Sequence, residues 1–301
     1  MRTKIFDRKL DFACLSAHAN FIYWQIADYF DNWLAPPPGI PFEDWVNVFA
    51  EILSNFTDIR LAARTLISTT ALTLYRERYH PSLESFPTLQ DVHHKIMLTH
   101  YDPRSHLARY QETILNRTQG LLQALGTQIC SHRRLVWQRY VDSNWAISLE
   151  HLPIDYQNLF ISVTIAKILL YRMANNLRSS KLVELFVLDE ASTIFRKQYY
   201  DADHPNLLLD YLAKSREFGI GFLIATQTLS GLADPVLANT ATKILVGGAG
   251  LGTDYDTFAS ATGLSLQQRD FLRTMTMPGM ACAKDPRYPW PFTLEVPRVV
   301  E

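Results

Sequence analysis

An unbroken apolar run that ends in two adjacent carboxylates constrains this chain more than any other stretch of its sequence. Residues 185–188 read Leu-Phe-Val-Leu, and Asp189 and Glu190 follow directly. A short apolar run without alternation is typical of a strand buried on both faces of a parallel sheet. Such a strand delivers its last side chains to the carboxyl edge of the sheet, where α/β proteins bind ligands. The stretch therefore predicts either an acidic site in an α/β fold or a core strand that ends in a solvated acidic turn.

The rest of the chain alternates between strand and helix signals, with one long helical stretch. Further strands are predicted at 3–7, 145–149, 220–226 and 243–246, and a hairpin at 279–284 and 292–296. Strands and helices in alternation predict a mostly parallel sheet with helices on both faces. After the proline cluster at 35–41, the apolar residues recur at helical spacing up to residue 130. We therefore expect an α/β core at 1–34 and 131–301 and an all-helical insertion at 35–130.

Three polar residues outside the acidic pair are candidates for the same site. Gln227 ends the strand predicted at 220–226, so its amide should lie at the same sheet edge as the carboxylates. An amide there can donate to a phosphate oxygen and accept from a water molecule. Arg216 ends the preceding helix, either as a functional cation or as a solvated cation favoured by the helix dipole. Asn239 precedes the strand at 243–246 and either approaches the site or serves as a turn or cap residue.

Three segments in order along the chain resemble the motifs of one ATPase class. They are 185–191 (LFVLDEA), similar to a Walker B strand, 215–227 (SREFGIGFLIATQ) and 237–244 (LANTATKI). Together they are similar to the HerA/FtsK class of P-loop ATPases, hexameric motors that pump DNA or protein and include the ATPases of conjugation and type IV secretion. Residues 7–11 and 33–39 also resemble segments of that class. The resemblance implies a RecA-like P-loop NTPase core with an all-helical insertion.

The resemblance also assigns a role to each candidate residue. Asp189 would hold Mg²⁺ through its water shell, Glu190 would be the catalytic base, and Gln227 would sense the γ-phosphate of ATP. Arg216 matches the arginine finger that relatives place into the site of the neighbouring subunit. Such a finger is worth about 10³ to 10⁵ in rate in other NTPases. We assign Asn239 to nucleotide binding alongside Asp189. The implied cofactors are ATP and Mg²⁺, and the implied assembly is a homo-hexameric ring.

One motif of that class is missing from the sequence. No G-x-x-x-x-G-K-[ST] pattern occurs, and the glycine-rich stretch at 247–252 lacks the lysine, so we interpret it as a loop. The loop and its lysine supply most of the nucleotide affinity in such enzymes. We therefore expect that the chain is either a fragment truncated before its phosphate-binding half or a form without that half. In either case we expect that the isolated chain does not hydrolyse ATP, because the phosphate cradle is missing. We also expect that it does not fold to full stability, because an interior strand of the sheet would be missing.

Composition restricts the cellular setting and the partners. The net charge of −1 provides no overall basic field, so any DNA contact must rest on local charge or on the centre of an oligomer. Three cysteines without a C-x-x-C pair fit a reducing cytosol. No apolar run reaches the roughly 18 residues of a membrane span. We predict a cytoplasmic protein with no membrane span.

The sequence thus favours an ATPase motor that couples ATP hydrolysis to the movement of DNA. A first alternative is a non-hydrolysing assembly subunit, which would bind partner subunits and turn over nothing. A second alternative stays within the resembled class and is a type IV secretion ATPase that moves protein. A nuclease or a secretion channel would be the expected partner in these settings.

Overall fold

The computed structural model places the chain in two compact units. One comprises residues 1–189 with 214–223, and the other comprises 190–213 with 224–301. The description covers the whole chain except residues 19, 58, 60, 79–85, 132–136, 197–206, 248–251, 275–278 and 298–301.

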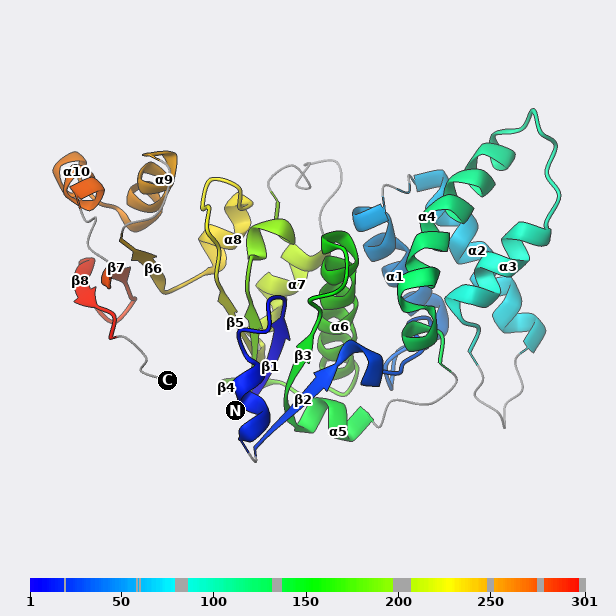
Figure 1. Cartoon of the computed structure of the whole chain (residues 1–301), viewed down its shortest axis with the longest axis horizontal. Helices are drawn as coiled ribbons and strands as arrows, with labels where there is room; N and C mark the ends of the chain where they lie inside the picture. Colours follow the sequence, from blue (N-terminus) through cyan, green and yellow to red (C-terminus); the bar gives the residue numbers. More distant parts are fainter. Residues whose placement is uncertain are drawn as a thin grey trace. The chain divides into compact units, whose positions relative to one another are not determined.

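A five-stranded, mostly parallel sheet forms the centre of the first unit (Figure 1). Its strands, in the order β2-β3-β1-β4-β5, are β2 (Phe21–Gln25), β3 (Asn144–Ser148), β1 (Arg2–Asp7), β4 (Ser179–Leu188) and β5 (Phe218–Ile224). Strand β1 pairs in parallel with both β3 and β4, and β2 pairs in parallel with β3. The sheet confirms the predicted α/β class. Strand β2 was not predicted, although its Phe-Ile-Tyr-Trp run is rich in strand-forming residues.

Aromatic side chains fill the core between the sheet and α6 (Ile154–Ala174). The ring of Phe6 on β1 lies 5.5 Å from Trp145, 6.5 Å from Phe160 and 6.3 Å from Phe186, measured between ring centres. All four side chains are at most 1% exposed. Helix α6 is buried around much of its circumference, including polar residues such as Asn158 and Lys167, as expected for a helix enclosed by other elements.

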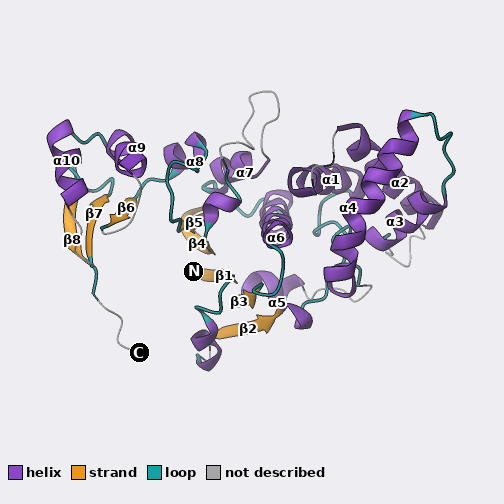
Figure 2. Ribbon diagram, turned by 45° about the horizontal axis from the view of Figure 1, so that its top comes forward, coloured by secondary structure: helices purple, strands orange, loops and turns teal. Residues whose placement is uncertain are grey.

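Among the described residues between β2 and β3, four helices of ten residues or more follow one another without an intervening strand (Figure 2). They are α1 (Phe42–Thr57), α2 (Leu61–Arg78), α3 (Leu89–Leu98) and α4 (His106–Ile129). Helix α1 packs against both α2 and α6, and α4 packs against α2 and α3. These helices occupy the stretch predicted as helical, and the division of the chain into core and insertion stays a prediction.

A helix cap and a buried ion pair stabilise this helical stretch. Thr88 and Asp91 form a capping box at the start of α3, in which each side chain accepts a hydrogen bond from the backbone N–H of the other residue. Ahead of α1, Asp31 accepts a 2.6 Å hydrogen bond from Lys167 Nζ on α6, and both side chains are nearly buried. Burial lowers the pKa of Lys167, and the Asp31 carboxylate opposes that shift. A buried pair of this kind is strongly destabilised when one partner is removed.

The second unit contains a separate antiparallel sheet. Its strands are β6 (Lys243–Val246), β7 (Met280–Lys284) and β8 (Phe292–Glu295), in that order. The β7–β8 hairpin was predicted correctly. The prediction of a buried strand at 243–246 in the parallel sheet was wrong, because Leu245 packs on the cluster around Phe258 while Ile244 and Val246 are 58% and 51% exposed.

The remaining elements are short and complete the connections between those described above. They are η1 (Ala13–Ala17), η2 (Ile26–Asp28), α5 (Trp137–Asp142), η3 (Ala191–Thr193), α7 (Leu207–Ser215), α8 (Asp234–Asn239), α9 (Gly252–Thr262) and α10 (Leu266–Thr274). In the part of the chain that the structure describes, no helix combines the length and apolar content needed to cross a membrane.

Candidate functional site

The predicted acidic pair follows the last residue of β4. Asp189 and Glu190 are both half-buried, and Glu190 adopts a left-handed backbone conformation with φ 49° and ψ 40°. Two hydrogen bonds hold this turn: Ala191 N–H donates to Ala225 O at 2.9 Å, and Thr193 Oγ1 donates to Glu190 O at 2.9 Å. The chain therefore turns sharply at Glu190 and ties the residue after it to the segment that follows β5.

Gln227 lies against Glu190, as the sequence predicted. Its side-chain amide donates a short hydrogen bond from Nε2 to Glu190 Oε1. The residues on either side of it form a local turn, in which Thr226 Oγ1 donates to Thr228 O at 3.1 Å and accepts from Thr228 N–H at 3.3 Å. Of the two polar atoms of an amide, only the nitrogen can donate to a carboxylate. A carboxylate and a donor amide thus meet beyond the ends of two strands.

A third carboxylate shares this edge of the sheet and was not assigned to the site from the sequence. Strands β1 and β4 pair in parallel, and their last paired residues are Phe6 and Leu188. Asp7 and Asp189 are the next residue of each chain segment. Asp7 is fully buried and accepts hydrogen bonds from Tyr23 Oη at 2.8 Å and from Phe12 N–H at 3.1 Å. Burial, together with the hydrogen bond to Asp7, raises the pKa of Tyr23 to about 12. Asp7 is thus committed to holding the loop after β1.

The structure does not bring Arg216 to this edge. Arg216 is exposed and precedes β5, whereas Gln227 follows that strand. The seven residues of β5, at about 3.3 Å each, place the two at opposite ends of a strand on the order of 20 Å long. The backbone carbonyl of Arg216 accepts from Gly219 N–H, which closes the turn into the strand. Arg216 therefore lies too far along the sheet to act on the site of its own chain.

Asn239 is also occupied elsewhere. It is the last residue of α8, and its Nδ2 donates to Pro235 O at 2.8 Å, one turn back in the same helix. Among the described residues, no hydrogen bond connects Asn239 to Asp189, Glu190 or Gln227. This arrangement corresponds to the helix-end alternative that the sequence left open.

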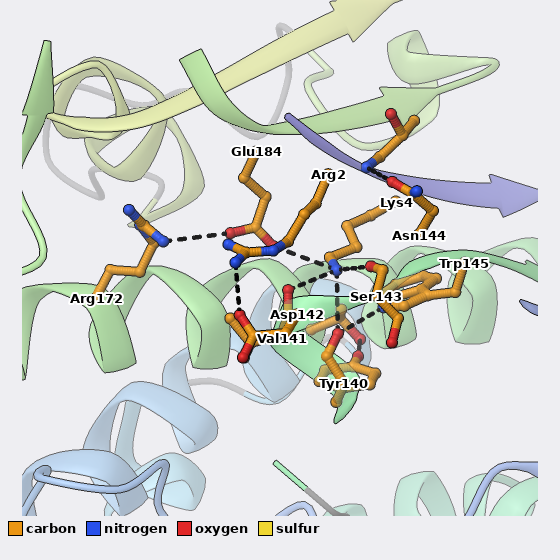
Figure 3. A network of polar contacts seen from close by, with 12 residues as sticks. Arg2, Lys4, Tyr140, Val141, Asp142, Ser143, Asn144, Trp145, Arg172 and Glu184 are labelled. Carbon is orange, nitrogen blue, oxygen red and sulfur yellow. Dashed lines mark hydrogen bonds and ion pairs between the residues drawn. The ribbon is translucent and has the colours of Figure 1, made fainter. Parts of the chain in front are cut away.

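A buried charge network lies toward the other end of the same strands (Figure 3). Lys4 Nζ donates to the carbonyls of Tyr140 and Val141 at 3.1 and 2.9 Å and lies 3.7 Å from Glu184 Oε1. Arg172 approaches the other oxygen of Glu184 at 3.8 Å. Burial lowers the pKa of Lys4 to about 8 and raises the pKa of Glu184, while their mutual attraction opposes both shifts. The network is remote from Asp189, which suits a structural role.

The described residues hold no group of three or more His, Cys, Asp or Glu side chains placed to bind a metal ion. Mg²⁺ in nucleotide sites is commonly held by one or two carboxylates together with waters and phosphates. The half-buried Asp189, next to Glu190 at the carboxyl edge, fits that mode of binding.

Comparison with known proteins gives the fold. No protein-family model matches the chain, and no curated protein sequence matches it significantly. Among solved structures, VirB4 of Thermoanaerobacter pseudethanolicus matches with a TM-score of 0.71 and 14% identity, over 99% of this chain and 82% of that chain. The bacterial conjugative coupling protein TrwB, lacking its N-terminal segment, matches with a TM-score of 0.68 and 12% identity, over 98% and 78%. At such identities the likeness shows the fold alone, and the chain shares the RecA-like α/β fold of these two proteins.

Proposed function

We propose that this chain is the hydrolytic part of a translocase-type ATPase. The observation that carries the proposal is the hydrogen bond between Gln227 and Glu190, formed beyond the carboxyl ends of two neighbouring strands. In α/β sheets this edge binds ligands. A carboxylate that follows another carboxylate, and that is held by an amide from the next strand, is suited to orient a water molecule and to respond to a nearby phosphate.

ATP and Mg²⁺ fit the chemistry of these side chains. Structures of TrwB with ADP and Mg²⁺, and with an ATP analogue, support the same cofactors for a chain of this fold. When bound, ATP would supply the phosphoric anhydride bond that is cleaved. Asp189 would hold Mg²⁺ through water, Glu190 would accept a proton from the attacking water, and Gln227 would contact the γ-phosphate. Asn239 has its amide engaged within α8, so its assignment to the nucleotide depends on rotation of that side chain.

No G-x-x-x-x-G-K-[ST] occurs among the 301 residues, so the proposed site needs a phosphate-binding loop that this motif does not supply. The five strands of the parallel sheet pair without the interior gap expected from the sequence, and a further strand carrying such a loop would fit beside β5, whose outer edge pairs with no other strand in the described ranges. We therefore keep the prediction that this chain supplies the acidic half of the site while another segment or chain supplies the phosphate cradle.

The position of Arg216 favours assembly into a ring. An exposed cation at the far end of β5 can serve a neighbouring subunit more readily than its own site. A homo-hexamer in which Arg216 reaches the next site would make activity depend on assembly. DNA is the favoured cargo, because TrwB is described as a conjugative and plasmid coupling protein. The alternatives are a type IV secretion ATPase that moves protein and a non-hydrolysing assembly subunit.

Replacing Glu190 tests the proposal. In a preparation that turns over ATP, as a longer form or as a complex that supplies the phosphate-binding loop, Glu190→Gln should lower turnover by at least about 100-fold, the range expected for loss of a general base. The affinity for ATP should change by less than about threefold, because the amide keeps the shape of the side chain. Glu112→Gln on α4, an exposed position, is the matched control.

Turnover and nucleotide affinity are measured on the three proteins in parallel. Turnover by Glu190→Gln within a few-fold of wild type would rule out the role of Glu190. Loss of both turnover and binding would instead place Glu190 in nucleotide binding. A wild-type assembly that contains the phosphate-binding loop and still fails to hydrolyse ATP would favour the assembly subunit.

A further inference from the structure

We propose that Asp254 is a positioning residue that fixes the loop carrying Gln227. Asp254 lies in the first turn of α9 and is only 2% exposed. Its Oδ1 accepts two backbone hydrogen bonds, from Leu229 N–H at 2.9 Å and from Ser230 N–H at 2.8 Å. Both donors belong to the loop that follows Gln227. The part of this inference that concerns catalysis rests on the proposed role of Gln227, whereas the part that concerns the loop does not.

The opposite end of the same loop is fixed by the acidic turn. Ala225 O accepts from Ala191 N–H at 2.9 Å, next to Glu190. Gln227 thus occupies the middle of a short span between two anchors, one at Ala225 and one at Leu229. Within that span its amide reaches Glu190. A loop held at both ends presents a side chain within a narrow range of positions, which is what a contact to a reacting group requires.

A buried carboxylate suits this task better than a neutral side chain would. Two N–H groups converge on one oxygen, and hydrogen bonds to an ionised acceptor are roughly twice as strong as neutral ones. The first turn of a helix also favours a negative charge, because the helix dipole is positive there. Without Asp254, two backbone donors would lose their acceptor in a part-buried place.

The anchor also joins the loop to the apolar core of its unit. Leu229, one of the two residues bonded to Asp254, packs against the cluster formed by Phe258, Leu272 and Cys282. Phe258 lies on α9, one helical turn after Asp254. Hydrogen bonds and apolar packing therefore connect the same loop to the same helix. A movement of α9 would therefore shift the loop that carries Gln227, and a movement of that loop would shift α9.

Hydrogen exchange of the backbone amides tests the anchor on the 301-residue chain itself. Asp254→Ala should speed exchange at Leu229 and Ser230 at least about tenfold, with the increase extending to Gln227. Asp254→Asn keeps the acceptor oxygen and should restore slow exchange to within about threefold of wild type. Asp256→Ala is the control. Asp256 lies on α9 like Asp254, but its ion pairs are with Arg269 and Arg273 of α10.

Two results would overturn the anchor. Unchanged exchange in Asp254→Ala is one, and equally fast exchange in Asp254→Asn and Asp254→Ala is the other. If Asp254→Ala fails to fold, the wild-type chain still gives an answer. Its amides at Leu229 and Ser230 should then exchange more slowly than the amide of Gln227, and equal rates would contradict the anchor.

Turnover tests the link to catalysis, in the ATP-hydrolysing preparation described above. Asp254→Ala should lower kcat at least about tenfold with KM for ATP nearly unchanged, and should cause no further loss when added to Gln227→Ala. Multiplying losses would show that Asp254 acts independently of Gln227 and would overturn the link. Full turnover in Gln227→Ala would defeat the proposed sensor role, while the exchange data would still decide whether Asp254 anchors the loop.

Discussion

At the residue scale, Glu190 combines a strained backbone with a predicted chemical role. A non-glycine residue in the left-handed region costs roughly 1 to 2 kcal/mol. Two hydrogen bonds hold Glu190 in this conformation, because Ala191 N–H donates to Ala225 O and Thr193 Oγ1 donates to the carbonyl of Glu190 itself. Strain of this kind gathers at functional sites. The sequence predicted the acidic pair and the nearby amide, but it carried no signal for the backbone conformation, which depends on contacts with Ala225.

A second residue-scale prediction concerns the buried Lys4. Its pKa is lowered to about 8 by burial, whereas an unfolded lysine titrates near 10.5. Between these values the unfolded chain binds more protons than the folded chain, so the contribution of Lys4 to stability rises with pH. The free energy of unfolding of wild type, minus that of Lys4→Met, should therefore increase from pH 8 to pH 10. Urea unfolding at several pH values measures it, and a flat difference would contradict the assigned shift.

At the element scale, local patterns predicted the strands and helices well and their partners less well. The apolar runs at 185–188 and 220–226 predicted β4 and β5, and a strand was also predicted at the position of β1. Pairing is a long-range property, which explains why the strand at 243–246 was assigned to the wrong sheet. Strand β3 joins β1 and β2 across more than a hundred residues. No local signal in residues 243–246 distinguishes a strand of the parallel sheet from one that pairs with β7.

The outer edge of β5 gives an element-scale prediction. The strand contains no charged residue and no proline, and Leu223 on it is 51% exposed. An unprotected apolar edge strand is a template for pairing with another chain. Leu223→Lys should therefore reduce self-association of the isolated chain, measured by sedimentation. Leu107→Lys on α4, where the leucine is 45% exposed, is the control. Equal effects of the two changes would show that general hydrophobicity, rather than the edge of β5, drives the association.

At the scale of the whole molecule, this chain supplies the fold and the acidic residues of the proposed site, and the site also needs a phosphate-binding loop. The RecA-like fold was predicted from the sequence, and its structural neighbours share it over nearly the whole chain. The positions of Asp189, Glu190 and Gln227 could be predicted because each follows an apolar run at the carboxyl edge, whereas their chemical roles stay a prediction. Asp254 could not, because its role depends on a loop 24 residues away in sequence and on burial that no local pattern reveals. The phosphate-binding motif is not in the 301 residues.

The central claim is that this chain holds the hydrolytic residues of an ATP site without the phosphate cradle. Thermal unfolding of the isolated chain, with and without Mg-ATP and paired with a phosphate-release assay, tests it most directly. The account predicts a low, broad transition that Mg-ATP leaves unchanged, and no phosphate release, because the cradle supplies most of the nucleotide affinity. A sharp transition that rises with Mg-ATP, accompanied by steady turnover, would contradict the account and show a complete nucleotide site within these 301 residues.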